Sequence, residues 1–137
     1  MRNSFVDNGL ENHVTYIEYL PHNEVIGEQQ SASVLLLILN NTPNAKGILT
    51  GKMFEYLAAK RPILCVGPTD GDAANIIAET QSGQTFDFDD EKGIDEHLKT
   101  LFNKFQTGNL NINSNGVNKY SRKALTGELV KVLEEIV

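Results

Sequence analysis

The chain has 137 residues, a formal charge of −6 and 40% hydrophobic residues. A single domain of this length buries roughly two-thirds of its unfolded surface, so a core needs neither disulfides nor a metal. Interleaved acids and bases argue against a duplex nucleic-acid partner, which would require a basic stripe. No run approaches the ~20 apolar residues of a membrane span, and the N-terminus lacks the apolar centre of a signal peptide. We therefore expect a soluble, cytoplasmic chain with one domain over residues 1–137.

Four short apolar runs predict buried strands. The second and third are apolar on consecutive residues, which is typical of parallel strands covered on both faces. In chain order the four runs are Val14–Leu20, Val34–Leu39, Pro62–Gly67 and Gln84–Asp89.

A segment of helical length follows each predicted strand: Asn23–Ser33, Thr50–Lys60, Asp72–Thr80 and Glu91–Phe105. This alternation predicts an α/β fold: a Rossmann-like, doubly wound parallel sheet of about four strands, with helices on both faces and right-handed crossovers. The sequence also predicts that the first strand lies beside the second or pairs with a second copy. The first ten residues resemble the end of a helix-to-strand connection, so we expect a fragment of a longer fold.

Two amphipathic helices complete the predicted fold. In the fourth helical segment, apolar residues at helical spacing predict a face packed on the sheet: Ile94, Leu98, Leu101, Phe102 and Phe105. His97 is expected on its polar side. A polar linker then leads to a last helix whose apolar residues share one face: Leu125, Leu129, Val132, Leu133 and Ile136.

The loop after the second predicted strand has the features of an anion site. It runs through Gly47 and Gly51 into a helix that carries Lys52 and Glu55. Glycines let backbone N–H groups approach an anion, a helix N-terminus favours negative charge, and Lys52 adds a point charge. A Walker-type phosphate loop does not match, because it needs four residues between its glycines and Ser or Thr after the lysine, where this chain has Met53.

Glu55 has two interpretations. It follows Lys52 by three residues, so it lies on nearly the same helix face, where its carboxylate can accept hydrogen bonds from the vicinal hydroxyls of a ribose. The alternative is a solvated ion pair with Lys52 or Lys60, which spacing alone favours.

The stretch "GKMFEYLAAKRPIL" resembles the donor-binding, C-terminal half of GT-B nucleotide-sugar glycosyltransferases of the group 1 (family 4) type. Within it, "FEYLAAKRPIL" resembles the family pattern E-A-M-A-x-G-x-P-V-V, with Glu55 in the glutamate position. The segments "YIEYLPHNEVIGEQQSASVLLLIL" and "ANIIAETQSGQTFDFDD" resemble the flanking parts of that half. The likeness covers about residues 10–135.

The resemblance implies a site for a nucleotide diphosphate sugar. Glu55 would bind the ribose, the helix start would hold the diphosphate, and the turn at Leu20–His22 would lie against the base. The implied residues are Glu55, Lys52, Gly51, Thr50, Gly47, Leu20 and His22. Many retaining members carry a second glutamate where this chain has Gly47, so the sugar and the stereochemical outcome stay open.

Other candidate residues have simpler explanations. The Asp-x-Asp patterns at Asp70–Asp72 and Asp87–Asp89 match metal sites of the other glycosyltransferase fold, but turns and helix capping explain them. The three histidines have no ligand spacing, so no metal is expected. Cys65 lies in an apolar run and is expected to be a buried, unreactive thiol. Arg122 and Lys123 could approach the donor phosphates, although a solvated basic cluster is favoured.

By this resemblance the chain is the donor-binding part of a longer glycosyltransferase and is inactive alone. Its expected partners are a nucleotide-sugar donor and, through the missing half, a polysaccharide or lipid-linked acceptor, with no cofactor. Membrane-surface association of the full enzyme and homo-oligomerisation stay open. The alternative is a non-catalytic, receiver-like module, but the second predicted strand ends in Asn40 and Asn41 rather than the aspartate that such modules need.

Overall fold

The computed structural model describes residues 2–136 of the chain. Its centre is a three-stranded parallel sheet of β1 (Leu35–Ile38), β2 (Ile63–Val66) and β3 (Gly83–Phe86), in that spatial order. Because sequential strands are neighbours, β2 is central and β1 and β3 are the two edges.

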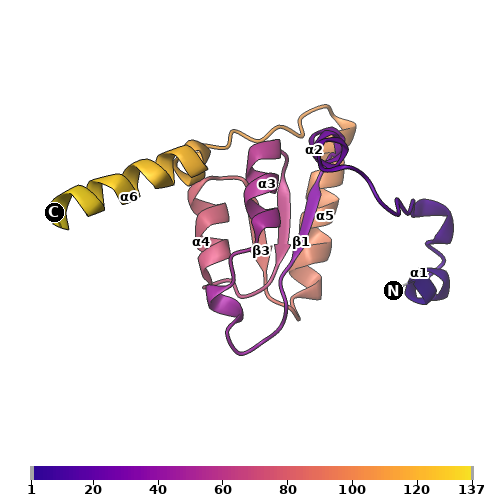
Figure 1. Cartoon of the computed structure of the whole chain (residues 1–137). Helices are drawn as coiled ribbons and strands as arrows, with labels where there is room; N and C mark the ends of the chain where they lie inside the picture. The colour runs from indigo at the N-terminus through magenta and orange to yellow at the C-terminus, as the bar shows by residue number, and fades with distance from the viewer. Residues whose placement is uncertain (1, 137) are drawn as a thin grey trace.

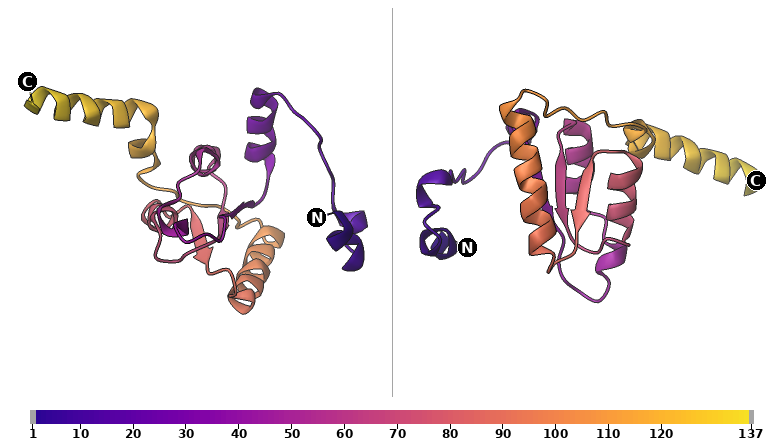
Figure 2. Two further views of the ribbon diagram at one scale, coloured as in Figure 1. Left: turned by 60° about the horizontal axis from the view of Figure 1, so that its bottom comes forward. Right: turned by 180° about the vertical axis from the view of Figure 1, so that it is seen from behind.

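Helices cover both faces of this sheet, as Figures 1 and 2 show. The crossovers α3 (Gly51–Ala59) and α4 (Asp72–Glu79) lie on one face, and α5 (Glu91–Gln106) lies on the other. The predicted α/β class, with a parallel sheet between helices and a C-terminal helix, is confirmed.

The core lies between the sheet and the two crossover helices. Leu37 and Cys65 are register partners on adjacent strands, and both side chains are fully buried. The same cluster continues into α3 and α4 through their inward-facing residues: Met53, Leu57, Ala73, Ile76 and Ile77. Cys65 is a free thiol, and its burial raises its pKa, so it packs as a small hydrophobe.

The prediction of a strand at Val14–Leu20 is wrong. This segment is irregular, and it connects α1 (Arg2–Asp7) and η1 (Glu11–His13) to α2 (His22–Ser31). Figures 1 and 2 show it leading away from the sheet. An extended apolar sequence becomes a strand only when a neighbouring backbone completes its hydrogen bonds, and β1 does not do so here.

The apolar face of α5 is less buried than predicted. Of its apolar residues only Leu101 is buried, whereas Leu98, Phe102 and Phe105 are about half exposed. His97 instead packs against Phe86 of β3, with ring centroids 5.2 Å apart, so it does not lie on a purely polar side. Desolvation lowers its pKa.

After α5 an irregular linker leads to η3 (Val117–Tyr120) and α6 (Arg122–Ile136). Figure 1 shows α6 extending away from the sheet. Its predicted apolar face is exposed along its length, from Leu125 to Ile136.

Lys60 ends α3 in a left-handed conformation, with φ 55° and ψ 43°. A residue with a Cβ pays about 1 kcal/mol for this conformation, which glycine adopts freely. We expect Lys60→Gly to raise the free energy of unfolding by about 1 kcal/mol in urea denaturation. Lys60→Ala, which keeps the Cβ, is the control and should give no such gain; an equal gain from alanine would contradict this explanation.

Candidate functional site

The start of α3 is set by a side-chain cap. Thr50 has extended backbone angles, and its Oγ1 accepts a hydrogen bond of 3.3 Å from the Met53 N–H. The helix then turns Met53 and Leu57 into the core. Residues at i, i+3, i+4 and i+7 share a face of a helix, so Gly51, Phe54, Glu55 and Ala58 form the outer face of α3.

That outer face is the floor of a groove of about 440 Å³, called here the α3 groove. One wall comes from the first residue of α2 and the other from the junction of η3 with α6. Its lining residues are His22, Gly51, Phe54, Glu55, Ala58, Tyr120, Ser121, Arg122 and Leu125.

Glu55 is partly buried in this groove and is held by α2. Gln29 Nε2 donates a hydrogen bond of 3.1 Å to Glu55 Oε2. A carboxylate offers about four lone-pair positions, so this bond orients the group and leaves acceptor capacity toward the groove. α2 is also tied to the end of α3 by Arg61 Nε, which donates to the Gln30 carbonyl at 2.6 Å.

The groove combines an acceptor, a cation and aromatic rings. Arg122, the first residue of α6, adds a guanidinium to the groove lining. Phe54 and Tyr120 pack against each other with centroids 6.4 Å apart and an interplanar angle of 43°. Such a set can hold a ligand that has hydroxyls, a negative charge and a flat ring.

Three of the seven residues that the resemblance implies line the α3 groove: His22, Gly51 and Glu55. Thr50 and Lys52 flank Gly51 in the chain but do not line the groove. Successive residues of a helix are turned by about 100°, and this rotation separates Lys52 from the outer face. The cation that lines the groove together with Glu55 is Arg122, and its side chain is exposed, as the predicted solvated cluster requires.

The other two implied residues lie outside the groove lining. Gly47 ends the short helix η2 (Ala45–Gly47), and Leu20 precedes α2. Sequence reasoning missed Phe54 and Tyr120. Phe54 follows Gly51 by three residues, and this helical spacing predicts that the two share a face. No local sequence pattern places Tyr120 against α3.

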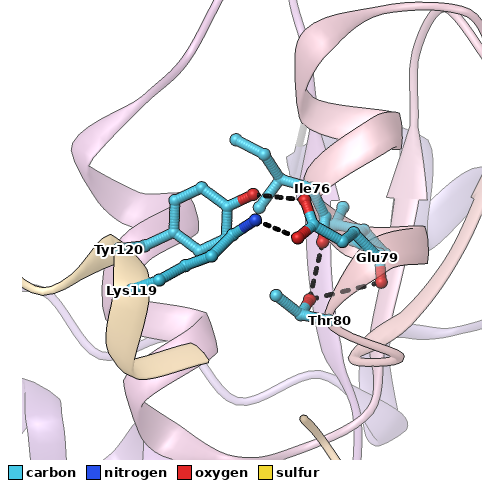
Figure 3. A network of polar contacts seen from close by, with 6 residues as sticks. Ile76, Glu79, Thr80, Lys119 and Tyr120 are labelled. Carbon is cyan, nitrogen blue, oxygen red and sulfur yellow. Dashed lines mark hydrogen bonds and ion pairs between the residues drawn. The ribbon is translucent and has the colours of Figure 1, made fainter. Parts of the chain in front are cut away.

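A polar network holds the Tyr120 wall in place, as Figure 3 shows. The Tyr120 hydroxyl donates to Glu79 Oε2 at 2.7 Å, and Lys119 Nζ pairs with Glu79 Oε1. Lys119 and Tyr120 lower the pKa of Glu79 by hydrogen bonding, and the bond to Glu79 raises the pKa of Lys119. The carboxylate at the end of α4 thus fixes η3, and with it one side of the α3 groove.

The network predicts a pH dependence. Because the folded-state pKa of Glu79 lies below its ordinary value of 4.5, the stabilisation is present above that value and is lost as the pH falls through the folded pKa. We expect wild type to unfold at a higher temperature than Glu79→Gln at neutral pH, and this difference to vanish under acidic conditions. Both proteins contain all the other carboxylates, so the titration of those groups affects the two unfolding temperatures equally. If the difference between the two temperatures does not change with pH, the role of Glu79 is contradicted.

A second polar hollow, of about 520 Å³, lies at the carboxyl ends of the strands. Its main charges are already paired, since Lys46 Nζ and Asp70 Oδ2 lie 2.5 Å apart. This pair raises the pKa of Lys46 and lowers that of Asp70. With its cation neutralised, this hollow suits a neutral polar ligand better than a diphosphate.

Asp70, Asp72 and Asp87 of the two Asp-x-Asp patterns have local roles. Asp87 Oδ1 accepts from the Phe88 N–H at 2.8 Å, and Asp72 lies in the first turn of α4. None of these aspartates caps a helix, so the capping part of the prediction is wrong: the N-cap of α4 is Gly71, and α5 is capped by Asp90, whose Oδ1 accepts from the Gly93 N–H at 2.9 Å. Within residues 2–136 no group of three or more His, Cys, Asp or Glu side chains could hold a metal ion.

No protein-family model, no curated protein and no solved structure matches this chain. In the described part of the chain, no helix combines the length and the apolar character needed to cross a membrane.

Proposed function

We propose that the chain binds the nucleoside diphosphate part of a nucleotide sugar in the α3 groove, as the donor-binding half of a GT-B-type glycosyltransferase. The observation that carries the proposal is the position of Glu55, which the sequence resemblance identifies as a ribose ligand. It lies in a groove with His22, Gly51 and Arg122.

Each part of the ligand has a matching group. The Glu55 carboxylate accepts hydrogen bonds from the ribose hydroxyls, in an orientation set by Gln29. Arg122 and the N–H groups of the first turn of α3 neutralise the diphosphate. The flat base lies against Phe54 and Tyr120, or toward His22 as the resemblance implies.

In the transfer reaction, the bond between the sugar and the diphosphate breaks while an acceptor oxygen bonds to the sugar carbon. The negative charge that develops on the leaving diphosphate is stabilised by preoriented donors, here the α3 amides and Arg122. By the resemblance, the acceptor and the group facing the sugar belong to another domain. We therefore expect binding without turnover from this chain alone.

Chemical-shift mapping tests the location. Titration of isotope-labelled protein with uridine, guanosine or adenosine diphosphate should shift the backbone signals of Gly51, Glu55 and Arg122. The signals of Lys46 and Asp70, in the second hollow, should shift little. The reverse pattern would place the ligand at the carboxyl ends of the strands and overturn the proposed site.

A further inference from the structure

The chain contains two asparagine–glycine pairs, Asn8–Gly9 and Asn115–Gly116. Asparagine is a thermolabile residue, because the backbone nitrogen of the next residue can attack its side-chain carbonyl carbon. Glycine as the next residue favours this attack, since it has no Cβ to crowd the nitrogen and its backbone adopts many conformations. Both asparagines and both glycines are exposed to solvent, so sequence and exposure alone do not distinguish the two pairs.

In the first pair, hydrogen bonds hold both reacting groups. The Gly9 N–H donates to the Val6 carbonyl at 3.0 Å, and Asn8 Nδ2 donates to the Ser4 carbonyl at 2.7 Å. The nitrogen that would attack is thus engaged, and the amide that it would attack is bonded to the backbone of α1. Attack at Asn8 therefore requires both hydrogen bonds to break first.

In the second pair, neither reacting group is held. Within residues 2–136, neither the Gly116 N–H nor the Asn115 side-chain amide has a hydrogen-bond partner. Gly116 has φ 68° and ψ 4°, a left-handed conformation that glycine adopts readily, and a Cβ built there would meet no atom within 4 Å. The nitrogen that would attack Asn115 is therefore free and uncrowded.

Asn115 also anchors one wall of the α3 groove. Its backbone N–H donates to the Thr80 carbonyl at 2.9 Å, and Thr80 is fully buried in the turn between α4 and β3. η3 begins two residues after Asn115 and brings Lys119 and Tyr120 to Glu79, as Figure 3 shows. A change in the length of the main chain at Asn115 would therefore fall between two fixed points of this wall.

We propose that Asn115–Gly116 is a site of spontaneous conversion of asparagine to isoaspartate, and that the conversion loosens η3 from Glu79. The Gly116 nitrogen bonds to the Asn115 Cγ, and Nδ2 leaves as ammonia with the proton of that nitrogen, which closes a succinimide ring. Water then adds to the ring carbonyl that was the Asn115 backbone carbonyl, and the bond from this carbon to the Gly116 nitrogen breaks. The main chain now runs through Cβ and Cγ with an added methylene, and the released carbon is a carboxylate.

Ageing of the folded chain at mildly alkaline pH, where the attacking nitrogen loses its proton more readily, tests the site. Peptide mapping by mass spectrometry measures the conversion at each asparagine, and chromatography separates isoaspartyl from aspartyl peptides. We expect Asn115 to convert about 10-fold faster than Asn8, because each hydrogen bond that holds the first pair slows the attack there. In urea the two rates should become similar. Equal rates in the folded chain, or a difference that persists in urea, would overturn the proposal.

Hydrogen exchange tests the effect on η3. The N–H groups of Lys119 and Ser121 are hydrogen-bonded to carbonyls within this segment, and both should exchange faster in aged than in fresh wild type. Asn115→Gln keeps the backbone bond to Thr80, but its longer side chain must close a larger ring, so ageing should leave its exchange unchanged. Fresh Asn115→Asp, which has the new charge without the added methylene, should exchange as slowly as fresh wild type. Faster exchange in either variant, or none in aged wild type, would contradict the loosening of η3.

Discussion

Glu55→Gln is expected to weaken binding of a nucleoside diphosphate by about 10-fold to 100-fold, because hydrogen bonds to a charged acceptor contribute roughly 1.5–3 kcal/mol. Glutamine has the same size and can still bond to Gln29, so the change removes charge and acceptor capacity but keeps the packing of α3 against α2. Isothermal titration calorimetry of both proteins gives the comparison.

The matched control is Glu28→Gln, on α2. It removes one negative charge from an exposed glutamate that does not line the α3 groove. Both substitutions therefore change the net charge of the protein by the same amount. We expect Glu28→Gln to bind like wild type, with both variants unfolding at temperatures close to that of wild type. Equal affinities for Glu55→Gln and wild type would remove Glu55 from the site.

Gly83→Ala is expected to lower the free energy of unfolding by about 3 kcal/mol or more. A Cβ at this position would lie 1.9 Å from the carbonyl oxygen of Ile63, its register partner on β2. The obstacle is backbone in the central strand, so neither strand can yield without losing ladder hydrogen bonds. The change should appear as a lower midpoint in urea denaturation.

Gly127→Ala in α6 is the comparison for Gly83→Ala. A Cβ there meets no atom within 4 Å, and alanine is favoured over glycine in a helix by about 1 kcal/mol. We therefore expect a neutral or slightly stabilising effect. Similar losses at both positions would show that the close approach of Gly83 to Ile63 does not explain the effect.

The parts of the fold that the sequence predicts are those that depend on local pattern. The consecutive apolar residues of β2 mark a strand buried between helices, and the periodicity of α3, α4 and α5 marks the helices. The same pattern in β1 predicts the strand but not its burial on both faces, because Leu36 and Ile38 are exposed. Val14–Leu20 has the same composition as a strand, but no strand in residues 2–136 pairs with it. Pairing depends on residues distant in the chain, and a local pattern cannot supply it. The exposed apolar side of α5 has the same cause, since helical spacing marks an apolar face but does not decide which residues cover it.

The same distinction between local patterns and long-range contacts applies to the candidate site. Gly51 and Glu55 lie within the first turns of one helix, so their spacing alone places them on one face. Arg122 and Tyr120 reach the α3 groove through the linker after α5 and the contact of η3 with Glu79. Neither the path of that linker nor the contact has a repeating sequence signal, so the groove's cation and one of its rings emerge only in three dimensions.

The binding of a nucleoside diphosphate by this chain can be measured without any variant. The most direct test is calorimetric titration of wild type with uridine, guanosine and adenosine diphosphates in turn, because the three differ only in the base. We expect saturable, one-to-one binding of at least one of them, with a Kd below about 1 mM, which corresponds to a binding free energy of roughly −4 kcal/mol. If none of the three diphosphates binds at a ligand concentration of about 1 mM, the proposed nucleotide site is wrong.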